Sequence, residues 1–481
     1  MTLDALAALP TCPSVAFSVG GSLGAGGWKW AVKCYIMVER KKIIRNETMK
    51  ISVEARRLNE QLVLSNPAVF KILSIRGKAI FFPREGILSQ SAQSAGKEIN
   101  ATIGIALEDD GKPMYLKSIA RQISAVEEKL FPYAPSYGRA DIRKTWHRMI
   151  KTKNPAIKEN SYSLPVVTAA LTHGLSICGY LFGDIGDKII LPDLYWENYD
   201  LIFSTSYGMK LDTYRTFNTR GGFDISALEK KISAGPKGKK MLILNFPNNP
   251  AGYTPTNEEV DEITKVLYEA AEKGNKIVVF VDDAYFGLVY EKGIFKESIF
   301  TKLNNLHRNI LAVKLDGPTK EDYVWGFRVG FITYGIKDGD MKLFQALEDK
   351  TAGAVRATIS NVSNLSQSLL ETAYGSTEYL QEKNSKYEIL ERRYRHIKEI
   401  LKQHPEYRDV FEVLPFNSGY FLCVKPNKAE PEKVRQILLA RYSTGVIVMT
   451  GVIRLAFSST PYAMISKLLN NLYLACLEAQ K

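Results

Sequence analysis

Polar side chains that could do chemistry follow three short apolar runs of the chain. These runs are residues 241–244, 277–281 and 310–313. The first leads into a turn of three asparagines, two prolines and a glycine at 245–252, the second ends at Asp282 with Tyr285 close behind, and the third precedes Lys320 and Arg328. A desolvated lysine can act as an amine nucleophile, and an arginine can form a bidentate contact with phosphate. A carboxylate at the end of a buried strand needs a cationic or hydrogen-bonding partner, or its pKa rises.

Each of these features, taken alone, also fits a plain structural role. The asparagine turn could simply end a strand, Asp282 could cap a helix, and Lys320 and Arg328 could be two surface cations. Their order along the chain carries more weight. Together they would supply a partner for a ring nitrogen, a partner for a ring oxygen, a reactive amine and a phosphate clamp, which are the groups that pyridoxal phosphate (PLP) requires.

The elements that position these residues alternate between strands and helices. A further apolar run at 188–191 is rich in β-branched residues, and 257–273 has helical spacing of its apolar residues. This alternation predicts an α/β fold with a mostly parallel sheet covered on both faces. Ligands of such sheets bind at the carboxyl ends of the strands. A long charged helix at about 378–403 then leads into a C-terminal αβ segment.

Composition indicates an ordinary globular protein. The 481 residues are 45% hydrophobic and 24% charged, with a net charge of +13. Because the cations are scattered, we expect no nucleic-acid partner. The five cysteines form no C-x-x-C pair and the five histidines have no metal-ligand spacing, so we expect reduced thiols in a cytoplasm and no metal. No run of 18 apolar residues is present, so no membrane partner is expected.

Residues 1–48 differ from the remainder of the chain. They contain a glycine-rich stretch at 20–27, followed by a basic run. This stretch lacks the G-K-[ST] ending of a phosphate-binding loop, so we expect a disordered N-terminal extension instead.

Over roughly residues 98–460, the sequence resembles the class I/II aminotransferases of PLP fold type I, and most closely their aspartate and aromatic branch. The motifs that carry the resemblance are Asn249-Pro250-Ala251-Gly252, Asp282-Asp283-Ala284-Tyr285, Lys320, Arg328, and Arg454 within an Ile-Arg-Leu-Ala-Phe segment. The resemblance implies a large PLP-binding domain at 115–385. It also implies a smaller α+β domain, built from the N-terminal arm at 49–114 and from 386–481.

The resemblance also implies a role for each site residue. Lys320 would form the aldimine and then act as general base and acid, Asp282 would hold the ring nitrogen, and Tyr285 and Asn249 would bind the ring oxygen. The other residues expected to contact the cofactor are Leu171, Thr172, Trp196, Thr319, Arg328 and, from a neighbouring subunit, Tyr133. The residues expected to contact the substrate are Gly104, Asn249, Arg454 for the α-carboxylate, and Arg356 for a distal carboxylate across a homodimer.

The function implied is a cytoplasmic PLP-dependent aminotransferase of amino acid metabolism with a biosynthetic role. It would move an amino group between a dicarboxylic or aromatic L-amino acid and a 2-oxo acid such as 2-oxoglutarate, with ping-pong kinetics. The same motifs serve other PLP-dependent reactions, such as those of β-lyases and decarboxylases, and a non-catalytic PLP or amino-acid sensor is a further alternative.

Three departures from the family pattern affect the expected site. Gly317 stands where the family often has serine, and Tyr199 stands where the nearest relatives have histidine. Glu321 and Asp322 directly follow the lysine and are expected to add acidity beside it.

Overall fold

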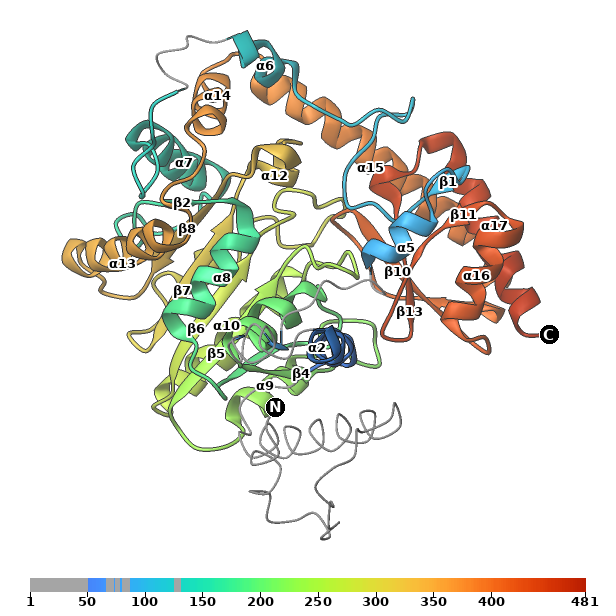
Figure 1. Cartoon of the computed structure of the whole chain (residues 1–481), viewed down its shortest axis with the longest axis horizontal. Coiled ribbons are helices and arrows are strands. Elements are labelled where there is room, and N and C mark those ends of the chain that lie inside the picture. The colour runs from blue at the N-terminus through green and yellow to red at the C-terminus, as the bar shows by residue number, and fades with distance from the viewer. Residues whose placement is uncertain (1–50, 66–72, 74–77, 80–86, 125–130) are drawn as a thin grey trace, which may run out of the picture.

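The computed structural model describes residues 51–65, 73, 78–79, 87–124 and 131–481 (Figure 1). The N-terminal extension expected at 1–48 lies outside the described residues.

A seven-stranded sheet forms the centre of the molecule. Its strands, in spatial order, are β2 (Val166–Thr168), β8 (Gly330–Gly335), β7 (Ile310–Asp316), β6 (Lys276–Asp282), β5 (Lys239–Asn245), β3 (Lys188–Pro192) and β4 (Lys210–Tyr214). Strand β8 runs antiparallel to both of its neighbours, β2 and β7, and all the other neighbouring pairs are parallel. The mostly parallel sheet predicted from the sequence is therefore confirmed, and the four apolar runs lie within β3, β5, β6 and β7.

Both faces of the central strands of this sheet are buried, which explains the apolar runs in β5 and β6. On β6, Ile277, Val279 and Val281 belong to one hydrophobic cluster, whereas Val278 and Phe280 belong to another on the opposite face. The helices associated with the sheet are α7 (Ala140–Lys153), α8 (Ala170–Phe182), α9 (Ile225–Ser233), α10 (Asn257–Glu272), α11 (Phe300–Leu303), α12 (Pro318–Glu321), α13 (Met341–Ile359) and α14 (Asn364–Tyr374). The irregular turns here are the π-helical η4 (Asp200–Ser206) and the 3-10 helix η5 (Trp325–Phe327).

A second, α+β layer combines the N-terminal segment with the C-terminal part of the chain. Its four-stranded antiparallel sheet has the order β12 (Ile447–Met449), β13 (Val452–Ala456), β10 (Phe421–Pro426) and β9 (Phe411–Val413). A separate parallel pair joins β1 (Ile99–Asn100) to β11 (Thr444–Gly445). Accordingly, β1 and α5 (Ile87–Gln93), drawn in blue in Figure 1, lie among the orange and red C-terminal elements.

Helix α15 (Tyr379–Gln403) leads from the side of α6 and α14 to the C-terminal elements, as expected for the charged stretch in this region (Figure 1). The remaining elements are α2 (Val53–Ser65), α6 (Lys117–Ala120), η2 (Arg121–Ser124), η6 (Pro405–Asp409), α16 (Pro431–Arg441), η7 (Phe457–Ser459), η8 (Tyr462–Met464) and α17 (Ile465–Ala479). Among the described residues, no helix has both the length and the apolar character required to cross a bilayer.

Candidate active site

The carboxyl ends of β5, β6 and β7 meet at one edge of the central sheet. Asn245 at the end of β5 pairs with Asp282 at the end of β6, and Asp282 pairs with Leu315 near the end of β7. Parallel strands place their final residues side by side, so the polar segments that follow them share this edge. The structure thus brings together the residues that the sequence placed after three successive strands.

Asp282 is a buried carboxylate with two hydrogen-bond donors. The hydroxyl of Tyr199 donates to Oδ2 over 2.6 Å, and the amide of Ala284 donates to Oδ1 over 3.1 Å. Burial raises the pKa of Asp282, whereas the Tyr199 hydrogen bond and the charge of Lys320 oppose that rise. Tyr199, the expected departure from the family pattern, therefore contacts this carboxylate directly.

The asparagine turn after β5 is fixed at both of its ends. The side chain of Asn245 donates to the carbonyl of Asp282 over 2.9 Å and accepts from the amide of Asn249 over 2.8 Å. At the far end, Gly252 has a φ of +72°, and a Cβ on it would lie 1.9 Å from the carbonyl oxygen of Phe421. Only glycine permits this approach of the turn to β10.

Lys320 lies in α12, a single helical turn that follows β7. Its half-buried amine lies 5.1 Å from the centre of the Tyr285 ring, and within the described part of the chain it has no hydrogen-bond partner. Burial lowers its pKa to about 8; Arg328 also lowers it, and Asp282 opposes the change. An amine with this pKa has an appreciable neutral, nucleophilic fraction near pH 7.

The loop that carries Lys320 lies against the N-terminus of α8. A Cβ on Gly317 would lie 2.8 Å from the Cα of Gly330, and a Cβ on Gly330 would lie 2.8 Å from the carbonyl carbon of Ala170. The first turn of α8 contains Leu171 and Thr172, and its N-cap, Ala169, contributes no side-chain cap. This helix N-terminus therefore presents backbone amides that can bind an anion.

Two further residues predicted to contact the cofactor, Thr319 and Arg328, belong to the segment between β7 and β8. Thr319 is buried beside Lys320, and its hydroxyl lies 3.4 Å from the carbonyl of Val329. Arg328 is exposed, adopts a left-handed φ of 55°, and donates to the carbonyl of Trp325 over 3.2 Å. Its effect on the pKa of Lys320 indicates that its charge is close to the amine.

Arg454 on β13 reaches the asparagine turn from the second sheet. It donates to Oδ1 of Asn249 and to the carbonyl of Thr102, each over 3.1 Å, and its guanidinium carbon lies 4.3 Å from the centre of the Phe421 ring. Its Nε is buried without a partner among the described residues. Gly104 borders the same place, since a Cβ on it would lie 3.5 Å from the Phe421 ring. Arg454 therefore keeps a donor available for a further acceptor, such as a carboxylate.

Trp196 and Glu197 are half-buried beside these groups. The Trp196 ring packs edge-on against Tyr199, with ring centres 5.7 Å apart. Burial raises the pKa of Glu197, and Arg454 acts in the opposite direction, so the two charges influence each other.

Within the described residues, neither Tyr133 nor Arg356 has a hydrogen bond or ion pair with the groups around Lys320. Tyr133 is 92% exposed, and Arg356 is exposed near the end of α13. Their expected roles across a homodimer therefore stay predictions.

Within the described ranges, no three His, Cys, Asp or Glu side chains are grouped as they would be to hold a metal ion.

Sequence reasoning missed two residues of this site, Tyr420 and Phe421. Thr102 and Phe421 contact Arg454, and the hydroxyl of Tyr420 donates to the backbone carbonyl of Lys320 over 3.2 Å. Thr102 lies two residues before Gly104, in the segment expected near the substrate, and acts through its backbone carbonyl. Tyr420 and Phe421 begin an apolar run that carries no sign of chemistry. No signal in the sequence alone could have identified them.

The family model for aminotransferase class I and II matches residues 97–472. The chain belongs to this family. The resemblance stated from the motifs is therefore confirmed for the family.

Individual curated aminotransferases match only part of this chain, at 25% and 28% identity. A probable N-acetyl-LL-diaminopimelate aminotransferase of Bacillus subtilis is 25% identical over 51% of this chain and 58% of its own length. Aspartate aminotransferase 1 of Medicago sativa is 28% identical over 40% of this chain and 46% of its own length. The alignments thus span about half the length of these curated relatives.

Solved aminotransferase structures share the fold over most of the chain. An aminotransferase from Anaerococcus prevotii superposes with a TM-score of 0.75 at 24% identity, covering 85% of this chain and all of its own. The aspartate aminotransferase of Thermus thermophilus with maleate gives 0.64 at 17% identity, covering 84% and 99%. The predicted PLP fold type I is therefore confirmed.

Proposed function

We propose that this protein is a PLP-dependent aminotransferase that moves an amino group between an L-amino acid, dicarboxylic or aromatic, and a 2-oxo acid such as 2-oxoglutarate. The observation that carries this proposal is the unpartnered amine of Lys320, with a pKa of about 8, beside the buried carboxylate of Asp282 and the uncapped N-terminus of α8.

The residues present fit PLP. Asp282 suits a protonated ring nitrogen because a cation there would compensate its burial. The side-chain amide nitrogen of Asn249 has no hydrogen bond within the described residues, and Tyr285 lies beside Lys320, so both can serve the ring oxygen. The half-buried Trp196 suits the face of the ring.

The phosphate of PLP suits the cation-rich side of the site. Leu171 and Thr172 belong to the first turn of α8, and Thr319 and Arg328 flank Lys320. Backbone amides at a helix N-terminus together with a guanidinium are a common way to bind phosphate.

Bound PLP supplies a ring that accepts electrons and so stabilises negative charge at the substrate Cα. The chain's own residues do the rest. The amine of Lys320 takes the proton from Cα, and the carboxylate of Asp282 keeps a proton on the ring nitrogen. Arg454 fixes the α-carboxylate of the substrate, which determines the bond at Cα that is broken.

The side chains around the site would determine which amino donor the protein accepts. Arg356 would favour a second carboxylate, and the aromatic side chains Trp196 and Tyr285 would accommodate aromatic donors. The aspartate aminotransferases among the similar proteins support a dicarboxylic substrate. The exposed positions of Tyr133 and Arg356 suit a homodimer in which each serves the opposite site.

The proposed arrangement has a large PLP-binding domain at 115–385 and a smaller domain made from 49–114 and 386–481. A cytoplasmic location agrees with three buried free thiols, those of Cys178, Cys423 and Cys476.

Absorbance spectroscopy with added PLP tests the proposal. Wild type should show a visible band that Lys320→Ala abolishes, whereas replacing the exposed Lys350 by alanine leaves it unchanged. Product analysis with a panel of amino acids and 2-oxoglutarate should show a keto acid formed in step with glutamate. A wild-type protein without the band would refute the proposal, and products of β-elimination or decarboxylation would assign another reaction to the same site.

A further inference from the structure

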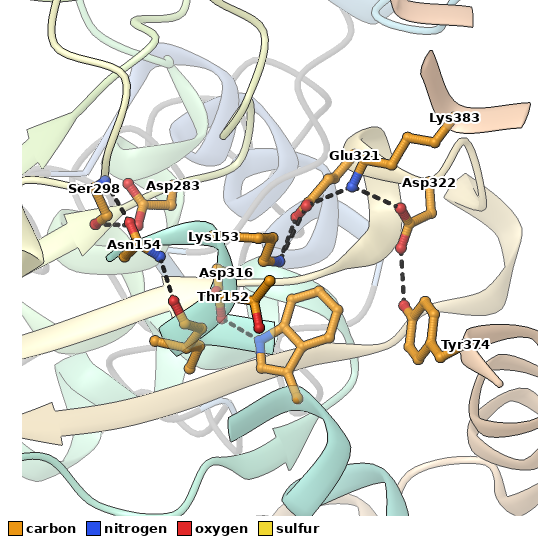
Figure 2. A network of polar contacts seen from close by, with 12 residues as sticks. Thr152, Lys153, Asn154, Asp283, Ser298, Asp316, Glu321, Asp322, Tyr374 and Lys383 are labelled. Atoms are coloured by element: carbon orange, nitrogen blue, oxygen red, sulfur yellow. Dashed lines mark hydrogen bonds and ion pairs between the residues drawn. The ribbon is translucent and has the colours of Figure 1, made fainter. Parts of the chain in front are cut away.

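The two acids that follow Lys320 are buried and paired with lysines (Figure 2). The amine of Lys383 lies 2.6 Å from Oε1 of Glu321 and 3.1 Å from Oδ1 of Asp322, and the amine of Lys153 lies 3.0 Å from Oε1 of Glu321. Neither acid is among the charges that shift the pKa of Lys320. The expectation that they add acidity beside this lysine is therefore corrected.

The N-terminus of α8, which lies against the loop that carries Lys320, contains a strained residue. Ala170, the first residue of α8, has a left-handed φ of 63°, which costs energy for a residue with a Cβ. Such a backbone persists only where surrounding contacts hold it. The amides that follow Ala170 are those proposed to bind the phosphate of PLP, so the contacts that hold this residue also shape the phosphate site.

The side chain of His173 makes such a contact. Its Nδ1 accepts a hydrogen bond from the amide of Ala169 over 3.1 Å, so the ring reaches back past Ala170 to the residue before it. On the other side of the ring, Nε2 lies 3.0 Å from Oγ1 of Thr358 on α13. The imidazole therefore connects the start of α8 to α13.

The two partners of the ring determine its tautomer. An amide nitrogen can only donate, so Nδ1 must be unprotonated. The single hydroxyl proton of Thr358 is directed to its own helix, where the carbonyls of Ala354 and Val355 lie at 2.9 Å and 3.2 Å, so Oγ1 accepts from Nε2. His173 is therefore neutral with its proton on Nε2. A proton on Nδ1 would face the N–H of Ala169 and break the contact.

Burial lowers the pKa of His173 and thus favours the neutral ring. The elements packed against α8 carry titratable groups, among them Arg356 on α13, Asp200 on η4, and Lys314 and Asp316 on β7, but none of them contributes to this shift. Because the folded-state pKa is lower than the unfolded one, the contact is fully present above about pH 6.5 and is lost as the pH falls through the folded value.

We propose that His173 is a positioning residue for the phosphate of PLP: its neutral ring holds the amide of Ala169, and with it the left-handed Ala170, so that the first turn of α8 presents its amides to the anion. This inference rests on the proposed function, which places the phosphate at α8. It requires an uncharged ring, whereas simple charge attraction would favour an imidazolium beside a phosphate.

Two substitutions of His173 test the contact. In His173→Asn, Oδ1 takes the place of Nδ1 and accepts from Ala169 at every pH, because a side-chain amide does not titrate in this range. In His173→Leu, the amide loses its partner. The Kd for PLP at pH 8, measured by titrating the apoprotein and following the visible band, should rise about tenfold in His173→Leu and stay within about twofold of wild type in His173→Asn.

Two further ligands separate the phosphate site from general damage. Pyridoxal has the ring and the aldehyde but no phosphate, so His173→Leu should leave its Kd nearly unchanged. Inorganic phosphate, titrated into the apoprotein by calorimetry, should show the same loss of about tenfold as PLP. Equal losses for PLP and pyridoxal, or a His173→Leu protein that binds PLP as tightly as wild type, would overturn the proposal.

A second histidine provides the matched control. His147 on α7 is also half-buried with its pKa lowered by burial, and it stacks on Tyr162 with ring centres 4.5 Å apart. His147→Asn should leave the affinities for PLP and inorganic phosphate unchanged.

The pH dependence tests the tautomer. The titrations of Lys320 and of the phosphate itself are common to all variants, so the ratio of the PLP Kd of wild type to that of His173→Asn cancels them. This ratio should be near one at pH 8 and rise as the pH falls below about 6.5, because only wild type loses the contact. A ratio that stays constant, or that falls in acid as expected for an imidazolium attracting the phosphate, would overturn the proposal.

Thr358→Val keeps the proposal testable if His173→Leu does not fold. Without an acceptor for Nε2–H, the ring can adopt the other tautomer, which cannot accept from Ala169. The Kd for PLP should therefore rise about threefold in the wild-type background and remain unchanged in the His173→Asn background. Equal weakening in both backgrounds would contradict a role through His173.

Failure of the proposed function has a different signature. A wild-type protein that binds inorganic phosphate but forms no visible band with PLP would refute the proposed function, and the phosphate titrations of the His173 variants would still decide the inference. A wild-type protein with the band, whose His173→Leu variant binds PLP normally, would refute the inference alone.

Discussion

The hydroxyl of Tyr199 lies 2.6 Å from the carboxylate of Asp282, and both side chains are buried at the carboxyl end of β6. Burial raises the pKa of Tyr199 well above its usual value, as does the neighbouring Asp282 charge, so the phenol stays neutral and acts as the donor. A neutral donor favours the ionised form of Asp282 without adding a charge to the buried site. This carboxylate is the group proposed to hold a protonated ring nitrogen.

The first prediction concerns this hydrogen bond. Tyr199→Phe removes the donor but retains the ring, so the pKa of Asp282 should rise further because its burial is less compensated. We expect kcat/KM to fall about tenfold or more, since one unit of pKa corresponds to about 1.4 kcal/mol.

Steady-state kinetics across pH checks this expectation. The control is Tyr195→Phe, because the hydroxyl of Tyr195 donates to Asp200 over 2.8 Å and not to Asp282. A pH profile of Tyr199→Phe that coincides with wild type would contradict the expectation.

The second prediction is a pH dependence for Lys320. Burial disfavours its charged form, so its pKa is about 8 and the amine loses its proton as the pH rises through that value. At pH 7 about one-tenth of the amine should be neutral, far more than for an ordinary lysine with a pKa of about 10.4. Labelling of Lys320 in the apoprotein should increase about tenfold per pH unit below this pKa and level off above it. A labelling midpoint near that of exposed lysines would refute the prediction.

The third prediction concerns Arg454. A lysine there cannot reach Asn249 and Thr102 together and still offer a donor in the position of the unpartnered Nε. Arg454→Lys should raise the KM for amino donors about tenfold or more, as expected for losing a charge-assisted hydrogen bond of about 1.5–3 kcal/mol. The exposed Arg408→Lys should leave KM unchanged, and kinetic measurement of both variants decides the outcome.

The fourth prediction concerns Glu197, whose charge interacts with that of Arg454. A carboxylate there should repel the distal carboxylate of a dicarboxylic donor. Glu197→Gln should therefore raise kcat/KM for aspartate relative to phenylalanine about fivefold, which corresponds to removing about 1 kcal/mol of repulsion. An unchanged ratio in a competition assay would show that Glu197 does not discriminate between these donors.

The fifth prediction compares two glycines with similar backbone conformations. Gly252 has a φ of +72° and faces the backbone of Phe421, whereas Gly287 has a φ of +83° with nothing within 4 Å of an added Cβ. Gly287→Ala should cost about 1–2 kcal/mol of unfolding free energy through backbone strain alone. Gly252→Ala should cost more, about 4 kcal/mol or above, because β10 must also move. Urea unfolding of both variants measures the difference, and equal costs would show that the close approach is not limiting.

The sequence by itself determined the central sheet and one edge of the candidate site. Apolar runs that are buried on both faces predict parallel strands, and parallel strands bring their carboxyl ends together. Asn249, Asp282, Lys320 and Arg328 therefore share an edge as soon as the strands are recognised. The reason is local, because Asn249 and Lys320 each follow a strand by four residues and Asp282 ends one, whereas Arg328 comes two residues before β8.

Only the tertiary structure decided which distant groups complete that edge. Arg454 meets Asn249 across 205 residues, and Lys153 meets Glu321 across 168 residues. The pairing of β10 with β13, the position of α15 and the closure of β1 onto β11 place these partners, and none of them leaves a local pattern. Long-range packing determines where charges are buried and compensated, which is why the two acids beside Lys320 looked like added acidity in the sequence and are neutralised in the fold.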